Sequence, residues 1–176
     1  QTTFDAVNQH FGTLFPGLFG GGEARLLMTG DEILDAGVQV IWQTGIAFES
    51  TAKQAVAGNA STYVSAFIYE MDLAYAMADL VISRAGASSV SEICLIGKAS
   101  ILVPLPSAAE DHQTENAKSL VSQNAAILVR DVDVKEKLIT EALAALQTDL
   151  STLEKNSLRL AKPNAAHEIA QSILSR

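Results

Sequence analysis

Residues Ala78 to Glu92 read Ala-Asp-Leu-Val-Ile-Ser-Arg-Ala-Gly-Ala-Ser-Ser-Val-Ser-Glu, the segment of the chain with the clearest structural pattern. A short apolar, β-branched run at 80–82 predicts a strand. Small and turn-forming residues follow it, and the pattern from Ala87 to Ile96 predicts a helix. In an open α/β sheet, ligands bind at the carboxyl ends of the strands, where such strand–turn–helix connections lie. The stretch therefore indicates a ligand site as well as a fold.

Two chemical features of this turn favour a phosphate group beside a sugar. Gly86 lets the backbone turn sharply and come close to a ligand. The first helical turn, at Ala87, Ser88 and Ser89, presents backbone N–H groups that favour an anion. Glu92 lies about one turn further on, where its carboxylate can accept hydrogen bonds from sugar hydroxyls. The same pattern also fits a plain strand–helix connection with serine caps and one solvated glutamate, because such units recur in every α/β protein.

Strands and helices alternate at short intervals along the rest of the chain. We expect strands at 38–42, 62–67, 80–82, 100–103 and 126–129, and helices at 49–56, 71–78, 87–96, 113–122, 134–146, 151–160 and 165–174. This order predicts an α/β fold, a parallel sheet with helices on both faces and right-handed crossovers. The turns expected on one rim of that sheet follow Trp42, Phe67, Ile82 and Val103.

A polar segment follows the last of these turns. His112 has the chemistry of a general base or a metal ligand, but no second histidine or cysteine lies at ligand spacing, so we predict no metal site. Gln113 and Asn116 carry donors and acceptors, which suits neutral hydroxyl groups. Alternatively, they cap the helix that begins here, where Asp111 and Thr114 are natural caps.

Composition and charge argue against several classes of protein. The chain has 176 residues, 48% hydrophobic and 18% charged, as expected of one globular domain. A formal net charge of −8 argues against nucleic acid as a partner, because phosphate binding needs a basic footprint. The single cysteine, Cys94, excludes a disulfide within the chain and is expected to be a small buried side chain. No apolar run approaches the roughly 20 residues that span a bilayer.

The first 29 residues are the least regular part of the sequence. Helical spacing predicts a short helix from Phe4 to Leu14. The glycines at 20–22 predict a flexible break, because they do not clearly lie between a strand and a helix. We therefore leave 1–29 unassigned and place the ligand-binding domain at 30–176.

Three separated segments resemble the MurG family of bacterial glycosyltransferases. They are Leu73–Ile93, Val103-Pro104 and Asp111–Ala117, in the family's order, and Gly37–Gly45 is similar to a strand of the family. The resemblance implies a GT-B fold of two Rossmann-like domains, of which this chain would be the C-terminal, UDP-GlcNAc-binding one. It also implies transfer of N-acetylglucosamine (GlcNAc) from UDP-GlcNAc to a lipid-linked peptidoglycan precursor, which converts lipid I to lipid II.

The resemblance implies roles for particular positions. Ile68 matches the position whose backbone reads uracil, and Met71 lies near the same base. Glu92 matches the acid that binds the ribose hydroxyls, and Gln113 matches the glutamine that holds the GlcNAc hydroxyls. The other matching positions are the amides that hold the pyrophosphate, at Ala87, Ser88 and Ser89, and two residues flanking the glutamine, His112 and Thr114. The family requires no bound metal for this step, no cofactor is implied, and none of these residues is expected to be catalytic.

Part of the family's pattern is absent from the sequence. The N-terminal domain, with its proposed catalytic base, its lipid I acceptor site and its membrane surface, has no counterpart. Acceptor binding and peripheral association with the cytoplasmic face of the bacterial inner membrane are expected through that domain. Phe19–Arg25 is only partly similar to the family's Gly-Gly-Ser loop, because Gly22 stands where the serine would be. We expect the isolated chain to bind UDP weakly and to transfer nothing.

Other classes of function fit parts of the pattern. One is another sugar-nucleotide enzyme of the same fold, such as a UDP-GlcNAc epimerase or a different GT-B transferase. Another is a non-enzymatic α/β binding domain that keeps only the scaffold. A dinucleotide oxidoreductase fits poorly, because no Gly-x-Gly-x-x-Gly motif opens a helix after a strand.

Overall fold

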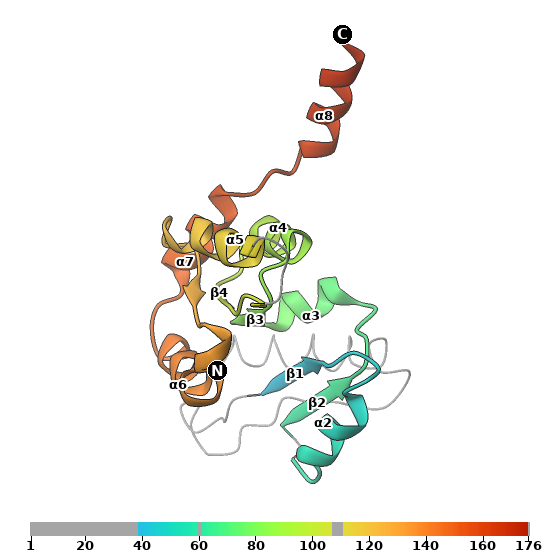
Figure 1. Cartoon of the computed structure of the whole chain (residues 1–176), viewed down its shortest axis with the longest axis vertical. Helices are drawn as coiled ribbons and strands as arrows, with labels where there is room; N and C mark the ends of the chain where they lie inside the picture. The colour runs from blue at the N-terminus through green and yellow to red at the C-terminus, as the bar shows by residue number, and fades with distance from the viewer. Residues whose placement is uncertain (1–38, 60, 107–110, 176) are drawn as a thin grey trace, which may run out of the picture. The chain divides into compact units, whose positions relative to one another are not determined.

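A computed structural model describes residues 39–59, 61–106 and 111–175 of the chain (Figure 1). The chain divides into two compact units, Gln1–Met77 and Ala78–Arg176. The helix predicted from Phe4 to Leu14, the glycine break at 20–22 and the domain boundary at 29/30 lie outside the described residues.

The described part of the first unit is a small parallel sheet with helices. Strands β1 (Val40–Gln43) and β2 (Thr62–Ser65) pair in parallel, and helix α2 (Glu49–Ala55) lies between them in the chain. Helix α3 (Met71–Met77) follows β2. Ala52 of α2 is fully buried, so this helix packs its small side chain inward. A parallel pair needs such a crossover, because the chain must return to the end where the first strand began.

The second unit contains a three-stranded parallel sheet. Its strands lie in the order β3 (Val81–Ser83), β4 (Ser100–Leu102), β5 (Ile127–Leu128). Helices α4 (Ala87–Ile96) and α5 (His112–Val121) connect them. After β5 the chain forms a 3-10 turn, η3 (Asp131–Asp133), and helices α6 (Val134–Leu146), α7 (Ser151–Arg159) and α8 (Ala165–Leu174).

Helices cover both faces of this sheet, as the sequence predicts. Adjacent residues of a strand point to opposite faces, and both Ile101 and Leu102 of β4 are fully buried. Leu102 packs in a cluster with Ile93 of α4 and Leu120 of α5. Ile101 packs in a second cluster that includes Ala142 of α6. A central parallel strand buried on both sides is the arrangement of doubly covered α/β sheets.

In the part of the chain that the structure describes, the hydrogen-bonded strands form two sheets, whereas the sequence pattern predicts that all the turns lie on one rim of a single sheet. The turns after β1 and β2 lie at the carboxyl ends of the two-stranded sheet, and those after β3 and β4 at the same ends of the three-stranded sheet. Parallel pairing is confirmed within each sheet. Periodicity along the chain predicts strands and their direction but does not name their partners, so it could not show where one ladder ends and the next begins.

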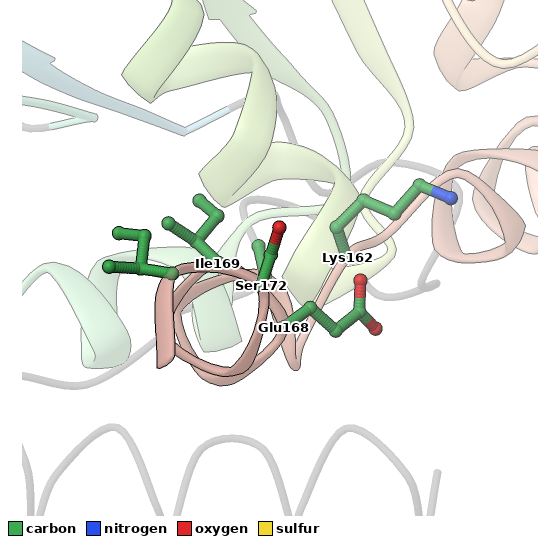
Figure 2. Close-up of a pocket in the computed structure, with 6 residues that line it drawn as sticks. Lys162, Glu168, Ile169 and Ser172 are labelled. Atoms are coloured by element: carbon green, nitrogen blue, oxygen red, sulfur yellow. The ribbon is translucent and has the colours of Figure 1, made fainter. Parts of the chain in front are cut away.

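The last helix, α8, presents a largely exposed apolar side, with Ile169, Ile173 and Leu174 more than half accessible to solvent. A shallow hollow lies along it, and Figure 2 shows Lys162, Glu168, Ile169 and Ser172 at its edge. The hollow contains none of the residues that the sequence assigns to the ligand site.

Candidate functional site

The turn between β3 and α4 leaves a helix N-terminus open. The first i→i−4 hydrogen bond of α4 runs from Val90 N to Gly86 O, at 3.0 Å. The N–H groups of Ala87, Ser88 and Ser89 precede it and have no carbonyl one turn earlier in the helix. Gly86 has no side chain with which to cap them, and Ser88 is exposed. Three backbone donors at the positive end of a ten-residue helix are suited to an anion.

Gly86 itself adopts φ −64° and ψ 150°, an extended conformation that any residue can take. The turn is therefore made without a positive φ, and its backbone conformation does not depend on the freedom of glycine. A Cβ built at Gly86 would have Ser89 Oγ, 4.0 Å away, as its nearest neighbour. The missing side chain leaves open space in front of the helix N-terminus, so the predicted close approach of a ligand stays compatible with the geometry.

Glu92 is exposed on the same helix. It stands four residues after Ser88 and three after Ser89, and residues at these spacings share a helix face. A carboxylate therefore lies one turn along the helix from the amide donors. An anion bound at the amides would place an attached group with hydroxyls within range of a hydrogen-bond acceptor.

Arg84 ties together the carboxyl ends of the three strands in the second unit. Its Nη1 lies 2.5 Å from Asp131 Oδ1, beyond β5, and 3.4 Å from Val103 O, beyond β4. The side chain is half exposed, so the ion pair adds at most about 1 kcal/mol to stability. Its main effect is to hold the turn after β3 against its neighbours. Local pattern alone did not predict this role for Arg84, although it is the one basic residue in a turn of small residues.

The start of α5 is fixed by side chains that reach other segments. Gln113 Oε1 accepts a hydrogen bond from Leu105 N at 3.0 Å, and Asn116 Nδ2 donates to Ala85 O at 3.0 Å. The second bond connects α5 to the turn before α4. Neither side chain caps its own helix, so the capping alternative for them is wrong. The carboxamide nitrogen of Gln113 carries two further N–H donors, and no hydrogen bond joins them to another of the described residues.

Asp111 was expected to be a natural cap, but α5 has no side-chain cap hydrogen bond. Asp111 adopts a left-handed conformation, with φ 55°, and its Oδ1 accepts from Thr114 Oγ1 at 2.6 Å. The carboxylate is therefore occupied by a side chain rather than by the helix amides. His112 is exposed at the first position of α5. In the described part of the chain, no group of three or more His, Cys, Asp or Glu side chains could hold a metal ion.

The remaining predicted site residues lie in the first unit. Ile68 is buried beyond the end of β2, and Met71 is the first residue of α3. The backbone N–H of Ile68 donates to Gln43 Oε1, the side chain that ends β1, at 2.9 Å. The exposed rings of Phe67 and Tyr69, on either side of Ile68, pack edge to face with centroids 4.9 Å apart. The sequence analysis missed Gln43, whose only signal is a polar side chain at the carboxyl end of a strand.

Cys94 is buried in the core of the second unit, as predicted. Burial raises the pKa of its thiol, because the charged thiolate loses its hydration there. The thiol is therefore a packing group and takes no part in the exposed turn at the other end of α4.

This geometry agrees with comparisons to known proteins. The crystal structure of Acinetobacter baumannii MurG superposes with a TM-score of 0.71 and 32% sequence identity, over 78% of this chain and 43% of that chain. The parallel sheets with helices on both sides and the open turn before α4 define a Rossmann-like fold, the C-terminal half of a GT-B glycosyltransferase. Residues 23–173 match the profile of the glycosyltransferase family 28 C-terminal domain. The chain belongs to this family.

Two curated relatives from different bacteria carry the same name. A UDP-N-acetylglucosamine–N-acetylmuramyl-(pentapeptide) pyrophosphoryl-undecaprenol N-acetylglucosamine transferase of Porphyromonas gingivalis is 48% identical over 143 residues, 79% of this chain and 38% of the relative. The protein of the same name from Cytophaga hutchinsonii is 44% identical over 146 residues, 81% of this chain and 39% of the relative. The chain thus spans about two fifths of the length of these relatives. Within the described residues, no helix is both long and apolar enough to cross a membrane.

Proposed function

We propose that this chain is the donor-binding half of an N-acetylglucosaminyltransferase, and that its ligand is UDP-GlcNAc. The observation that carries the proposal is the open N-terminus of α4 with Glu92 one turn further along the same helix. Helix α4 therefore carries both N–H donors for a pyrophosphate and a carboxylate acceptor for ribose hydroxyls. The names of the relatives, which act with UDP-N-acetylglucosamine, support this choice over other anionic ligands.

The proposed roles follow the chemistry of each position. Ala87, Ser88 and Ser89 would hold the pyrophosphate through their N–H groups, and Glu92 would bind the ribose. Backbone donors aimed at the pyrophosphate also stabilise the charge that develops on UDP as a leaving group, so this step needs no metal. The residues proposed to contact the base and the sugar are Ile68 and Met71 for uracil, and Gln113 flanked by His112 and Thr114 for the GlcNAc hydroxyls.

Transfer to lipid I, which yields lipid II in peptidoglycan synthesis, is proposed for the whole enzyme. The relatives' additional length would contain the acceptor site and the catalytic base. Peripheral association with the cytoplasmic face of the inner membrane is proposed for that part as well. The 176 residues alone are proposed to bind the donor weakly and to transfer nothing, because the acceptor site and the base are proposed for the additional length of the relatives. Measurable transfer to a lipid I analogue by this chain alone would refute that proposal.

The first test is calorimetric titration of the chain with UDP and UDP-GlcNAc in the absence of metal. Glu92→Ala should weaken binding by tenfold or more, about 1.4 kcal/mol. Glu141→Ala is the matched control, because it removes the same charge from an exposed position on α6. Absence of UDP binding in the wild-type chain would overturn the proposed function. Equal binding of UDP by the wild type and the Glu92→Ala variant would show that Glu92 does not bind the ribose.

The choice of sugar nucleotide needs a separate comparison. We expect UDP-GlcNAc to bind more tightly than UDP-glucose or a dTDP-sugar, because the side chains at the start of α5 would meet the N-acetylated sugar. A preference for UDP-glucose or a dTDP-sugar would favour a different enzyme of the same fold.

A further inference from the structure

One peptide group in the first unit is held from both sides by side chains. It joins Phe67 to Ile68, just beyond the end of β2. Its carbonyl oxygen, Phe67 O, accepts a hydrogen bond from Ser65 Oγ at 2.9 Å. Its N–H, on Ile68, donates to Gln43 Oε1, also at 2.9 Å. Both ends of this peptide dipole are therefore satisfied, and rotation of the peptide plane would break two hydrogen bonds at once.

We call this pair of hydrogen bonds, from Ser65 Oγ and to Gln43 Oε1, the clamp. Its position follows from the pairing of β1 and β2. Gln43 and Ser65 are opposite each other in the last register position of β1 and β2. Beyond them, backbone contact continues only briefly, through Thr44 N to Ser65 O at 3.0 Å and Gly45 N to Ala66 O at 3.0 Å. Further along, the carboxamide oxygen of Gln43, rather than a backbone carbonyl, accepts the hydrogen bond from Ile68 N. A glutamine suits this position because its side chain spans the gap and ends in a neutral acceptor.

At Ile68, the backbone rather than the side chain is the part of the loop that can form hydrogen bonds with a ligand. Ile68 is anchored in the interior, whereas the neighbouring Phe67 and Tyr69 are 56% and 83% exposed. The Ile68 N–H is already occupied by Gln43. The Ile68 carbonyl oxygen accepts no hydrogen bond from another backbone group of the described residues. The group that Ile68 can offer to a ligand is thus its carbonyl oxygen, an acceptor in the peptide group that directly follows the clamped one.

We propose that Gln43 and Ser65 are positioning residues that set the preference of this site for uracil. This inference rests on the proposed function, in which the backbone of Ile68 meets the base. An acceptor at Ile68 O fits the ring N3–H of uracil. Cytosine has no hydrogen at N3 and presents an acceptor there, so the two acceptors would face each other. The clamp orders the peptide group next to this carbonyl before the base binds, which lowers the cost of ordering the loop around the base.

The test compares UDP with CDP in calorimetric titrations of the 176-residue chain and its variants. Gln43→Met keeps the length of the side chain but removes the acceptor. It should reduce the preference for UDP over CDP by about fivefold, the worth of one hydrogen bond. Gln43→Glu keeps an acceptor at the same reach and should retain the preference. Ser65→Ala removes one of the two contacts and should reduce the preference by a smaller factor.

Three controls separate positioning from simple loss of structure. Glu92→Ala should weaken UDP and CDP equally, since the ribose is common to both. Gln54→Met makes the same substitution at an exposed position of α2 and should change neither affinity. Hydrogen exchange of the Ile68 amide, measured by NMR without nucleotide, should be slow in the wild type and in Gln43→Glu, and faster in Gln43→Met.

The outcomes are distinguishable. UDP binding that depends on Glu92, with an unchanged UDP-to-CDP ratio in Gln43→Met, would overturn the clamp and leave the proposed function intact. Unchanged exchange of the Ile68 amide in Gln43→Met would also overturn it. Failure of the wild-type chain to bind UDP at all would overturn the proposed function and this inference with it.

Discussion

The two ends of α4 differ in how their terminal backbone groups are hydrogen-bonded. At the C-terminal end, Ile93 O accepts from Lys98 N at 3.2 Å and from Ser157 Oγ at 3.4 Å. Gly97 closes the helix in a left-handed conformation, with φ 62°. At the N-terminal end, the amides before Val90 have no side-chain cap at Gly86, and the space in front of them is open.

The two glycines at the ends of α4 therefore have different roles. Gly97 serves the stability of the helix, and Gly86 leaves room for a ligand. A Cβ on Gly97 would lie 3.1 Å from Leu158 Cβ of α7, so both conformation and packing require glycine there. Among the described residues, and apart from its chain neighbours, a Cβ on Gly86 would have Ser89 Oγ at 4.0 Å as its nearest contact. We infer that the N-terminal amides are left open because a ligand is their partner. Substitutions at the two ends of α4 test this inference.

Gly97→Ala should destabilise the second unit by about 2 to 3 kcal/mol, from left-handed strain together with the close contact to Leu158. Chemical denaturation measures the change. Gly58→Ala is the control for strain alone, because Gly58 has φ 84° and a methyl group there would meet nothing within 4 Å. Equal losses in the two variants would show that packing against α7 contributes nothing.

Asn116→Ala should cost about 2 kcal/mol, because it leaves the buried carbonyl of Ala85 without its donor. Ala85 is fully buried, and Asn116 Nδ2 is bonded to its oxygen at 3.0 Å. The exposed bond from Asn156 Nδ2 to Asn124 O has the same length, so Asn156→Ala is the matched control and should change stability little. A large loss of stability in Asn116→Ala would show that one hydrogen bond beside the N-terminal end of α4 stabilises the fold. The two ends of α4 would then differ less in their contribution to stability.

Gly86→Ala should leave stability unchanged but weaken UDP binding about tenfold, since a methyl group would occupy the space in front of the helix amides. Calorimetry and chemical denaturation of the same variant separate the two effects. A stable variant with undiminished UDP affinity would show that the open space is not where the pyrophosphate lies.

Ser100→Ala should be neutral or stabilising by up to about 1 kcal/mol, because a buried hydroxyl without a partner gains nothing from the fold. Ser100 is fully buried in β4, and its Oγ has no hydrogen-bond partner among the described residues. Ser157→Ala, by contrast, removes the long bond to Ile93 O and should be slightly destabilising. Denaturation of both variants sharpens the comparison, because only Ser157 supports the C-terminal end of α4.

Local pattern was sufficient for much of the architecture. The bounds predicted for the helices at 87–96, 134–146 and 165–174 match α4, α6 and α8. The burial of Cys94 also followed from residue type and helical position. These features depend on side chains close in sequence, through periodicity and turn chemistry, and such information is present in the chain before it folds.

By itself, the sequence determined the strand–turn–helix unit at 78–96, the alternation of strands and helices and the resemblance that the family comparison confirmed. Only the tertiary structure decided the partners of Gln43, Arg84 and Asn116. Their hydrogen bonds join residues 25, 47 and 31 positions apart. It also decided that Gly86 is extended while Gly97 is left-handed. Contacts between distant segments depend on how the sheets and helices pack, and no short-range periodicity encodes that packing.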